Sequence, residues 1–117
     1  GFPRPLMVTD AVINIAPDLS TMADICRNAI DLAHRLGLAR PRLALLGPVE
    51  TVNPAIPSTL HAAALCKMAE RGQIAGADLD GPLAFDSAID PESARIKQIS
   101  SPVAGQADIL VAPDLDT

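Results

Sequence analysis

The apolar run Leu43-Ala44-Leu45-Leu46 lies between Pro41 and Gly47 and contains no polar position. A continuous run of this kind is expected of a β-strand that is covered on both faces by other elements. Strands of that type occur mainly in parallel sheets with helices packed on either side. The run therefore predicts a layered α/β arrangement before any other part of the chain is considered.

The segment ahead of this run has the period of an amphipathic helix. Apolar side chains recur at intervals of three and four residues, and Gly37 supplies a stop signal. Either Asp18 or Ser20 can cap the start of the helix. We expect a helix that ends at Leu36 and whose inner face consists of Met22, Ile25, Ala29, Leu32, Ala33 and Leu36.

Apolar runs and helical segments continue to alternate along the rest of the chain. The apolar run Leu6–Val8 predicts a brief strand that ends at Asp10, and further strands are expected at Ile74–Leu79 and Ile109–Ala112. The sequence also predicts a helix that Ser58 caps and Arg71-Gly72 ends, and short helical pieces at Phe85–Ile89 and Pro91–Ile99. Asp80-Gly81-Pro82 is typical of a turn. Strand and helix alternation predicts one α/β domain over residues 1–117, a three-layer α/β/α sandwich whose mostly parallel sheet is incomplete at the C-terminal end.

Composition and charge exclude several classes of function. The chain carries 14 acidic and 9 basic side chains, a formal net charge of −5, which is the opposite of what a nucleic-acid or anionic-membrane binder needs. No apolar run approaches the roughly 20 residues of a membrane span. Two isolated cysteines, Cys26 and Cys66, fit a reducing cytoplasm rather than a disulfide framework.

Polar segments follow the carboxyl ends of the predicted strands, which is the edge where open α/β sheets bind ligands. Glu50 and Asn53 lie in the long Gly47–Pro57 segment and could orient a substrate, or could be solvated or bind local backbone. Ser58 and Thr59 open the next helix, where hydroxyls and free N–H groups could hold a phosphate. Ordinary helix capping is the alternative for both.

Other chemistry-bearing residues have structural interpretations. Asp78, Asp80 and Asp86 lack the spacing of a calcium loop, and we expect the last two to accept backbone N–H groups around Gly81-Pro82. His34 and His61 are read as packing or surface residues. Cys26 and Cys66 are expected to act as small apolar residues rather than nucleophiles. The residue patterns alone name no catalytic group and no metal site.

Several longer motifs occur in a fixed order along the chain. They are Val8-Thr9-Asp10, Asn14-Ile15-Ala16-Pro17, Val49-Glu50-Thr51-Val52-Asn53-Pro54, Asp80-Gly81-Pro82-Leu83-Ala84-Phe85-Asp86, Ser101-Pro102-Val103-Ala104-Gly105 and Ala107-Asp108-Ile109-Leu110-Val111-Ala112-Pro113-Asp114. Together they resemble the phosphate acetyltransferase and phosphate butyryltransferase family over nearly the whole chain. The butyryltransferase-like branch, which includes proteins with a hydratase-type domain ahead of this module, is the closer match.

The resemblance implies reversible acyl transfer between coenzyme A and inorganic phosphate, without a metal or redox cofactor, in a dimeric protein of two α/β/α domains. Members of the family are longer, and their catalytic Ser-Arg and Asp lie further along, so no residue here matches them. We therefore expect most of a second domain, inactive by itself, with apolar surface near Leu110 and Val111 covered by self-association. The alternative is a non-catalytic ligand-binding or assembly module, such as an acyl-CoA-sensing regulatory domain.

Overall fold

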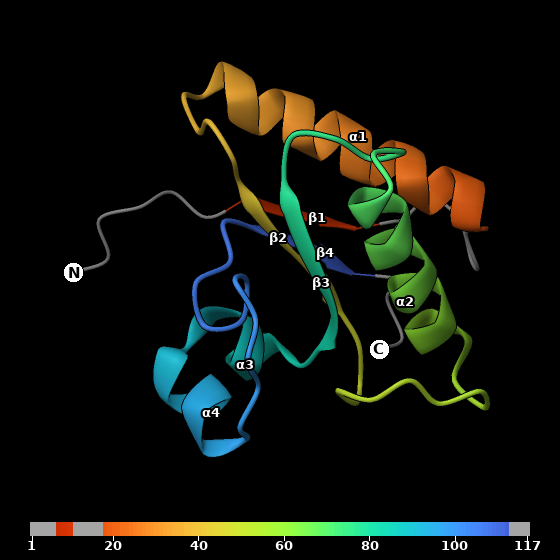
Figure 1. The fold of residues 1–117 in the computed structure, drawn as a ribbon, viewed down its shortest axis with the longest axis vertical. Coiled ribbons are helices and arrows are strands. Elements are labelled where there is room, and N and C mark those ends of the chain that lie inside the picture. Colours follow the sequence, from red (N-terminus) through yellow and green to blue (C-terminus); the bar gives the residue numbers. More distant parts are fainter. Residues whose placement is uncertain (1–6, 11–17, 113–117) are drawn as a thin grey trace.

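A four-stranded parallel sheet forms the centre of the computed structural model, which describes residues 7–10 and 18–112 (Figure 1). The strands are β1 (Met7–Asp10), β2 (Arg42–Leu46), β3 (Asp78–Leu83) and β4 (Ile109–Ala112), in the order β1-β4-β2-β3. The two central strands, β2 and β4, are buried, and Leu43 and Ile109 are paired and wholly inaccessible to solvent. The predicted burial of these strands is confirmed.

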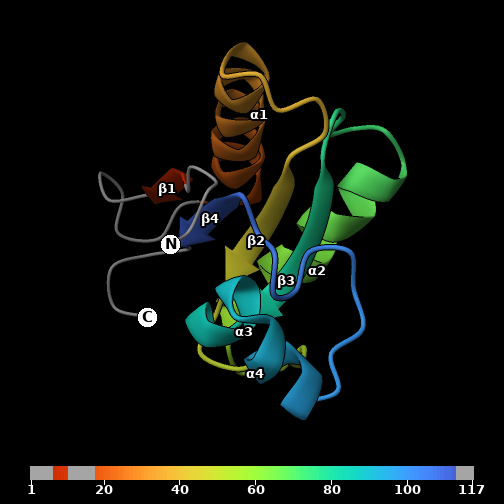
Figure 2. The same cartoon turned by 90° about the vertical axis from the view of Figure 1, so that its left-hand side faces the viewer.

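Helices cover both faces of this sheet, as Figure 2 shows from the side. Leu43, Leu45, Ile109 and Val111 belong to a core formed with α1 (Leu19–Arg35) and α2 (Pro57–Glu70). Alternate strand residues, including Ala44 and Leu110, face α3 (Phe85–Ile89) and the segment that follows α4 (Pro91–Ile96). The three-layer arrangement with an open parallel sheet agrees with the sequence prediction.

Helix α1 is rotated relative to the predicted inner face. Asp18 is the cap, and its Oδ1 accepts a hydrogen bond from the Thr21 backbone N–H at 2.7 Å. Leu32 and Leu36 are exposed, which contradicts their predicted burial, while small side chains such as Ala23 and Cys26 are buried. Apolar residues spaced three and four apart can form more than one adjacent stripe on the same helix, so the spacing does not decide which stripe faces the sheet. The stripe with the smaller side chains lets the helix lie closer to the sheet.

Strand β3 lies later in the chain than the predicted Ile74–Leu79 strand, and Asp80-Gly81-Pro82 lies within it rather than in a turn. As the last strand in the sheet order, β3 needs backbone hydrogen bonds on one side only, so a charged residue and a proline are tolerated there. Gly81 permits the close pairing, because a Cβ at this position would lie 2.6 Å from the Cβ of Leu45.

Two smaller expectations also fail. Helix α4 ends at Ile96 instead of Ile99, and Gln98 follows it in the left-handed region with φ 59°. The side chains of Leu110 and Val111 are buried, 1% and 0% exposed, so they supply no apolar surface for self-association. Within the described residues, no helix combines the length and the apolar character that a bilayer span requires.

Candidate functional site

The segment between β2 and α2 lies at the carboxyl end of the central strands, and Asn53 and Thr59 hold it to the helix. Thr59 is fully buried, and its hydroxyl accepts the Asn53 N–H at 2.9 Å and lies 2.9 Å from the Asn53 carbonyl oxygen. The Asn53 side chain in turn accepts the Ala55 N–H. The structure therefore brings these two predicted site residues together, and their contacts fix the shape of the segment.

Ser58 is placed differently from its neighbour. Ile56 occupies the cap position of α2 and makes no side-chain cap, so the predicted capping role of Ser58 is wrong. The Ser58 Oγ is buried and has no hydrogen-bond partner among the residues that the structure describes. Ser58 also lines a hollow of about 10 Å³ beside His61 and Leu46, room for a single water molecule. Within residues 7–10 and 18–112 this hydroxyl is thus unpartnered, and it lies at the start of a 14-residue helix.

Glu50 turns toward α3 and α4 instead of toward Asn53. Its Oε2 accepts a hydrogen bond from the Ala84 backbone N–H at 3.3 Å, and its Oε1 lies 3.3 Å from the Lys97 Nζ. The same ammonium group lies 3.2 Å from Oδ2 of Asp86. Glu50, Lys97 and Asp86 therefore link the segment after β2 to the start of α3 and the end of α4.

The charges of this cluster reinforce one another. The hydrogen bond from Lys97 lowers the pKa of Asp86 below its ordinary value of 3.8. Partial burial acts to lower the pKa of Lys97, but hydrogen bonds to Asp86 and Glu50 outweigh it and raise that pKa above 10.5. Both groups are accordingly held in their charged forms at neutral pH.

Sequence reasoning missed Lys97 altogether. A lysine near a helix end is common on protein surfaces, and only the tertiary fold brings it 47 residues back along the chain to Glu50. For the aspartates the prediction is partly correct, because Asp80 accepts the Gly81 N–H at 2.9 Å. Asp86 pairs with Lys97 rather than with the Gly81-Pro82 segment.

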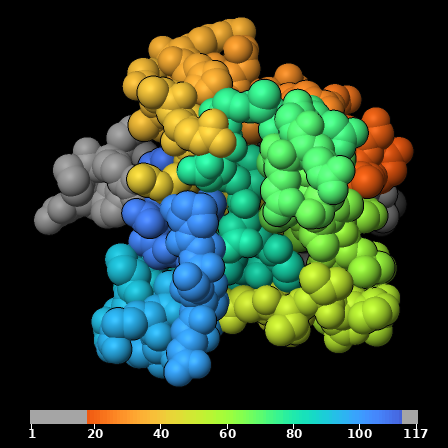
Figure 3. All heavy atoms as spheres, in the orientation of Figure 1, coloured from red at the N-terminus to blue at the C-terminus, as the bar shows by residue number. Residues whose placement is uncertain are grey.

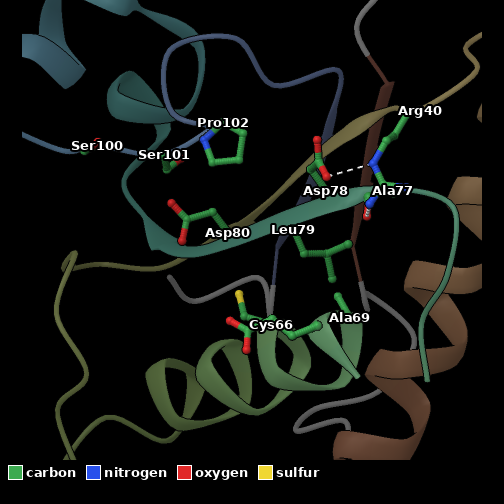
Figure 4. A pocket seen from close by; sticks show the side chains of 11 residues that line it. Arg40, Cys66, Ala69, Ala77, Asp78, Leu79, Asp80, Ser100, Ser101 and Pro102 are labelled. Atoms are coloured by element: carbon green, nitrogen blue, oxygen red, sulfur yellow. Dashed lines mark hydrogen bonds and ion pairs between the residues drawn. The ribbon is translucent and has the colours of Figure 1, made fainter. Parts of the chain in front are cut away.

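A second hollow, a groove of about 400 Å³, runs along the open edge of β3 (Figure 3). In Figure 4 its walls are the Ser100–Pro102 segment on one side and α2 on the other, with the Arg40–Asp78 ion pair, 2.9 Å long, at one end. Leu79 points toward α2, whereas Asp80 points toward Ser101. Both walls mix polar and apolar groups, since α2 contributes Glu70 beside Ala69 and the opposite wall contributes Pro102 beside Ser101.

The cysteines offer no nucleophile. Burial raises the pKa of both the Cys26 and the Cys66 thiol to about 12, so neither forms a thiolate readily near neutral pH. Cys66 lines the groove, and Cys26 is fully buried on the face of α1 that packs against the sheet. Across the described part of the chain, no three His, Cys, Asp or Glu side chains are grouped so that they could hold a metal ion.

The whole arrangement has close counterparts among known proteins. The sequence profile of the family described as phosphate acetyl/butaryl transferase matches residues 3–117. This chain belongs to that family. The match takes in both the sheet and the polar segments at its carboxyl edge, so the predicted family resemblance is confirmed.

Curated family members share high identity with the chain. It is 64% identical over 116 residues to a phosphate acetyltransferase of Rhizobium meliloti, covering 99% of this chain and 37% of that protein. A phosphate butyryltransferase of Clostridium acetobutylicum is 45% identical over 116 residues, covering 99% of this chain and 38% of its own length. The chain spans just over a third of the length of these curated relatives.

Solved structures of the family share the fold. A branched-chain phosphotransacylase from Enterococcus faecalis superposes with a TM-score of 0.81 at 39% identity, over 89% of this chain and 37% of that one. A phosphotransacetylase from Streptococcus pyogenes gives a TM-score of 0.80 at 32% identity, over 97% of this chain and 34% of the other. The parallel sheet with its two helical layers is therefore the architecture of the family.

Proposed function

We propose that the protein containing this chain transfers an acetyl or butyryl group between coenzyme A and inorganic phosphate. The observation that carries this proposal is the similarity of essentially the whole chain, at 64% identity, to a protein named phosphate acetyltransferase. Coenzyme A or its acyl ester and phosphate or its acyl ester are then the substrates, and we expect no further cofactor. In the forward direction the thiolate of coenzyme A attacks the carbonyl carbon of the acyl phosphate; the new C–S bond forms, the C–O bond breaks and phosphate leaves.

The carboxyl edge of β2 and the start of α2 are proposed as one wall of the substrate site. The Ser58 hydroxyl has no partner within the described residues, and the first backbone N–H groups of a helix favour an anion such as phosphate. Thr59 and Asn53 fix the approach to this helix through their mutual hydrogen bonds. Glu50 positions the same segment through the Ala84 N–H. In this proposal the four residues bind or orient substrate, and the catalytic groups lie elsewhere in the parent protein.

Because the catalytic groups are expected outside this chain, the 117-residue chain is expected to be inactive by itself. Stabilising the oxyanion of acyl transfer needs donors that converge from more than one side, and this chain supplies a single wall. We also propose that the protein is a homodimer. Large side chains that remain exposed, including Phe85 at 56% and Ile96 at 67%, support association with another surface. We expect the reaction to take place in the cytoplasm, which suits two unpaired cysteines.

The test is the release of coenzyme A from acetyl-CoA and from butyryl-CoA in the presence of phosphate. We expect the full-length protein to turn over at least one ester and the isolated chain to turn over neither, with light scattering on both samples reporting the oligomeric state. Within the full-length protein, Ser58→Ala is expected to raise the KM for phosphate, whereas Ser20→Ala, at an exposed hydroxyl on α1, serves as the matched control.

Two results would overturn this view. Turnover by the isolated chain at the rate of the full-length protein would show that the chemistry does not need the other segments. Acyl-CoA binding by the full-length protein without any release of coenzyme A would favour the alternative, a regulatory module that senses acyl-CoA.

A further inference from the structure

The cluster of Glu50, Lys97 and Asp86 joins three segments that are far apart in the sequence. Glu50 belongs to the segment between β2 and α2, Asp86 to the first turn of α3, and Lys97 to the end of α4. The Lys97 Nζ lies 3.3 Å from Glu50 and 3.2 Å from Asp86. By contrast, four ion pairs, such as Lys67–Glu70, are local to one helix, and the Arg40–Asp78 pair lies at the amino-terminal end of β3.

The Lys97–Glu50 pair is also less exposed than these local pairs. The side chains of Lys97 and Glu50 are 38% and 21% exposed, compared with 61% and 64% for the Lys67–Glu70 pair on α2. Partly buried charge pairs are screened less by salt and solvent, so their geometry is better defined. Glu50 gains a further directional contact from the Ala84 N–H. The cluster can therefore fix the position of a backbone segment, which an exposed pair within one helix cannot do.

Among the described residues, side-chain hydrogen bonds and ion pairs hold the segment that it fixes at two points. At one point Glu50 joins it to the α3–α4 layer, and at the other Asn53 joins it to Thr59 on α2. The residues between these points, Thr51 and Val52, are exposed, and Val52 has 52% of its surface accessible. Loss of the first attachment would leave Asn53 as the side-chain attachment within the described residues, and the start of the segment would still be held by the hydrogen bond from the Gly47 N–H to the Leu83 carbonyl oxygen at 2.9 Å.

We propose that Lys97 is a positioning residue for substrate binding: it holds Glu50, and through it the 47–56 segment, in the conformation that receives coenzyme A or phosphate. The inference rests on the proposed function and deepens it. Lys97 itself touches no substrate in this view, because two carboxylates already neutralise its charge. If the segment loses this attachment, part of the free energy of substrate binding is used to order the segment. Substrate affinity is then weaker, while the rate of the chemical step is unchanged.

The first measurement uses steady-state kinetics of the full-length protein. We expect Lys97→Met to raise the KM for coenzyme A or phosphate about threefold or more with little change in kcat, and Lys97→Arg to restore most of the loss. Lys67→Met is the matched control, since it removes the same group from an exposed pair within α2 and should leave both constants unchanged. Absence of transferase activity in the wild-type protein would refute the proposed function. If the wild type is active and Lys97→Met leaves KM unchanged, the positioning role is refuted.

The second measurement separates a local effect from general destabilisation. Amide hydrogen exchange should accelerate at residues 48–56 of Lys97→Met but not at Leu43–Leu45 in the buried strand. Glu50→Gln retains an acceptor for the Ala84 N–H and loses only the charge that faces Lys97. If Lys97 acts through Glu50, the two substitutions together raise KM no further than Lys97→Met alone. Fully additive effects, or unchanged exchange at residues 48–56, would overturn the inference even if Lys97→Met proved poorly folded in the kinetic assay.

Discussion

The two faces of the sheet are held by different kinds of interaction. Among the described residues, the core beneath α1 and α2 contains fourteen buried apolar residues, with large side chains such as Leu65 and Ile74. The core on the α3–α4 face contains six, of which Ala44, Ala88 and Ala107 are small. Backbone contacts supplement this second core, as in the bond from the Gly105 N–H to the Ser87 carbonyl oxygen at 2.7 Å.

This difference suggests that one face of the sheet mainly stabilises the fold and that the other mainly positions the polar segments. Burial of large apolar side chains is roughly proportional to area and tolerates small displacements, so the α1–α2 face can supply much of the free energy of folding. Small side chains and hydrogen bonds depend on close approach and direction. The polar segment that carries Glu50 is attached to the α3–α4 face. Contacts on this face determine where the segment lies more than they add to the free energy of folding.

The largest loss of stability should come from a substitution that places a charge in the core beneath α1 and α2. Leu45 is 2% exposed, and Leu45→Asp would bury a carboxylate without a partner at a cost of about 4 kcal/mol or more. Leu32→Asp, at an exposed position on α1, is expected to change the free energy of unfolding by less than about 0.5 kcal/mol. Urea unfolding followed by circular dichroism measures both. Equal midpoints for Leu45→Asp and the wild type would disprove the burial of β2.

A smaller loss of stability is expected on the α3–α4 face, where backbone segments lie close together. Gly105 and Gly72 have nearly the same backbone conformation, φ 80° and 79°. A Cβ at Gly105 would lie 2.7 Å from the Pro91 Cα, whereas one at Gly72 meets nothing within 4 Å. Since the strain of a positive φ is common to both, Gly105→Ala should lose about 1–3 kcal/mol more than Gly72→Ala. Similar unfolding midpoints would mean that the α3–α4 face is not closely packed.

Two adjacent hydroxyls at the start of α2 offer a finer comparison. Thr59→Val keeps the shape of a buried side chain but leaves the Asn53 N–H without its acceptor, at a cost of about 1–2 kcal/mol. Ser58→Ala removes a hydroxyl that has no partner in the described part of the chain, so stability should be unchanged or slightly increased. Thermal unfolding of both variants tests this. A larger loss for Ser58→Ala than for Thr59→Val would contradict the hydrogen bonds assigned here.

Much of the fold could be predicted from the sequence because buried strands and long helices leave strong local patterns. The Leu43–Leu46 run and the helix that begins after Asp18 are found where they were expected. Strand β3 could not be placed, because its Asp-Gly-Pro sequence is typical of a turn and becomes a strand only through pairing with β2. Tertiary pairing overrides local preference at the edge of this sheet.

The candidate site was predictable only in part. Its location followed from a general property of parallel sheets, the convergence of polar segments at their carboxyl edge. Its internal contacts did not follow, since Thr59 is recognisable as a partner of Asn53, and Glu50 as a partner of Lys97, only after the chain has folded. The 47-residue separation of the second pair leaves no periodic signal.

The smallest expected effect concerns the charges that attach the polar segment to the α3–α4 face. The pKa of Asp86 is lowered from 3.8 by the Lys97 hydrogen bond, so its contribution to stability is fully present above 3.8 and is lost as the pH falls through the lowered value. The pKa of Lys97 is raised from 10.5, so its contribution is present below 10.5 and is lost as the pH rises through the raised value. Lys97→Met should therefore unfold at a slightly lower urea concentration than the wild type, by a constant margin between about pH 5 and pH 9, and the margin should narrow toward both extremes. Because the cluster is partly exposed, 1 M NaCl should also reduce the margin. A margin that stayed the same from strongly acid to strongly alkaline pH would show that the methionine variant loses packing rather than charge, and that attachment on this face, like that of α1 and α2, depends on apolar bulk.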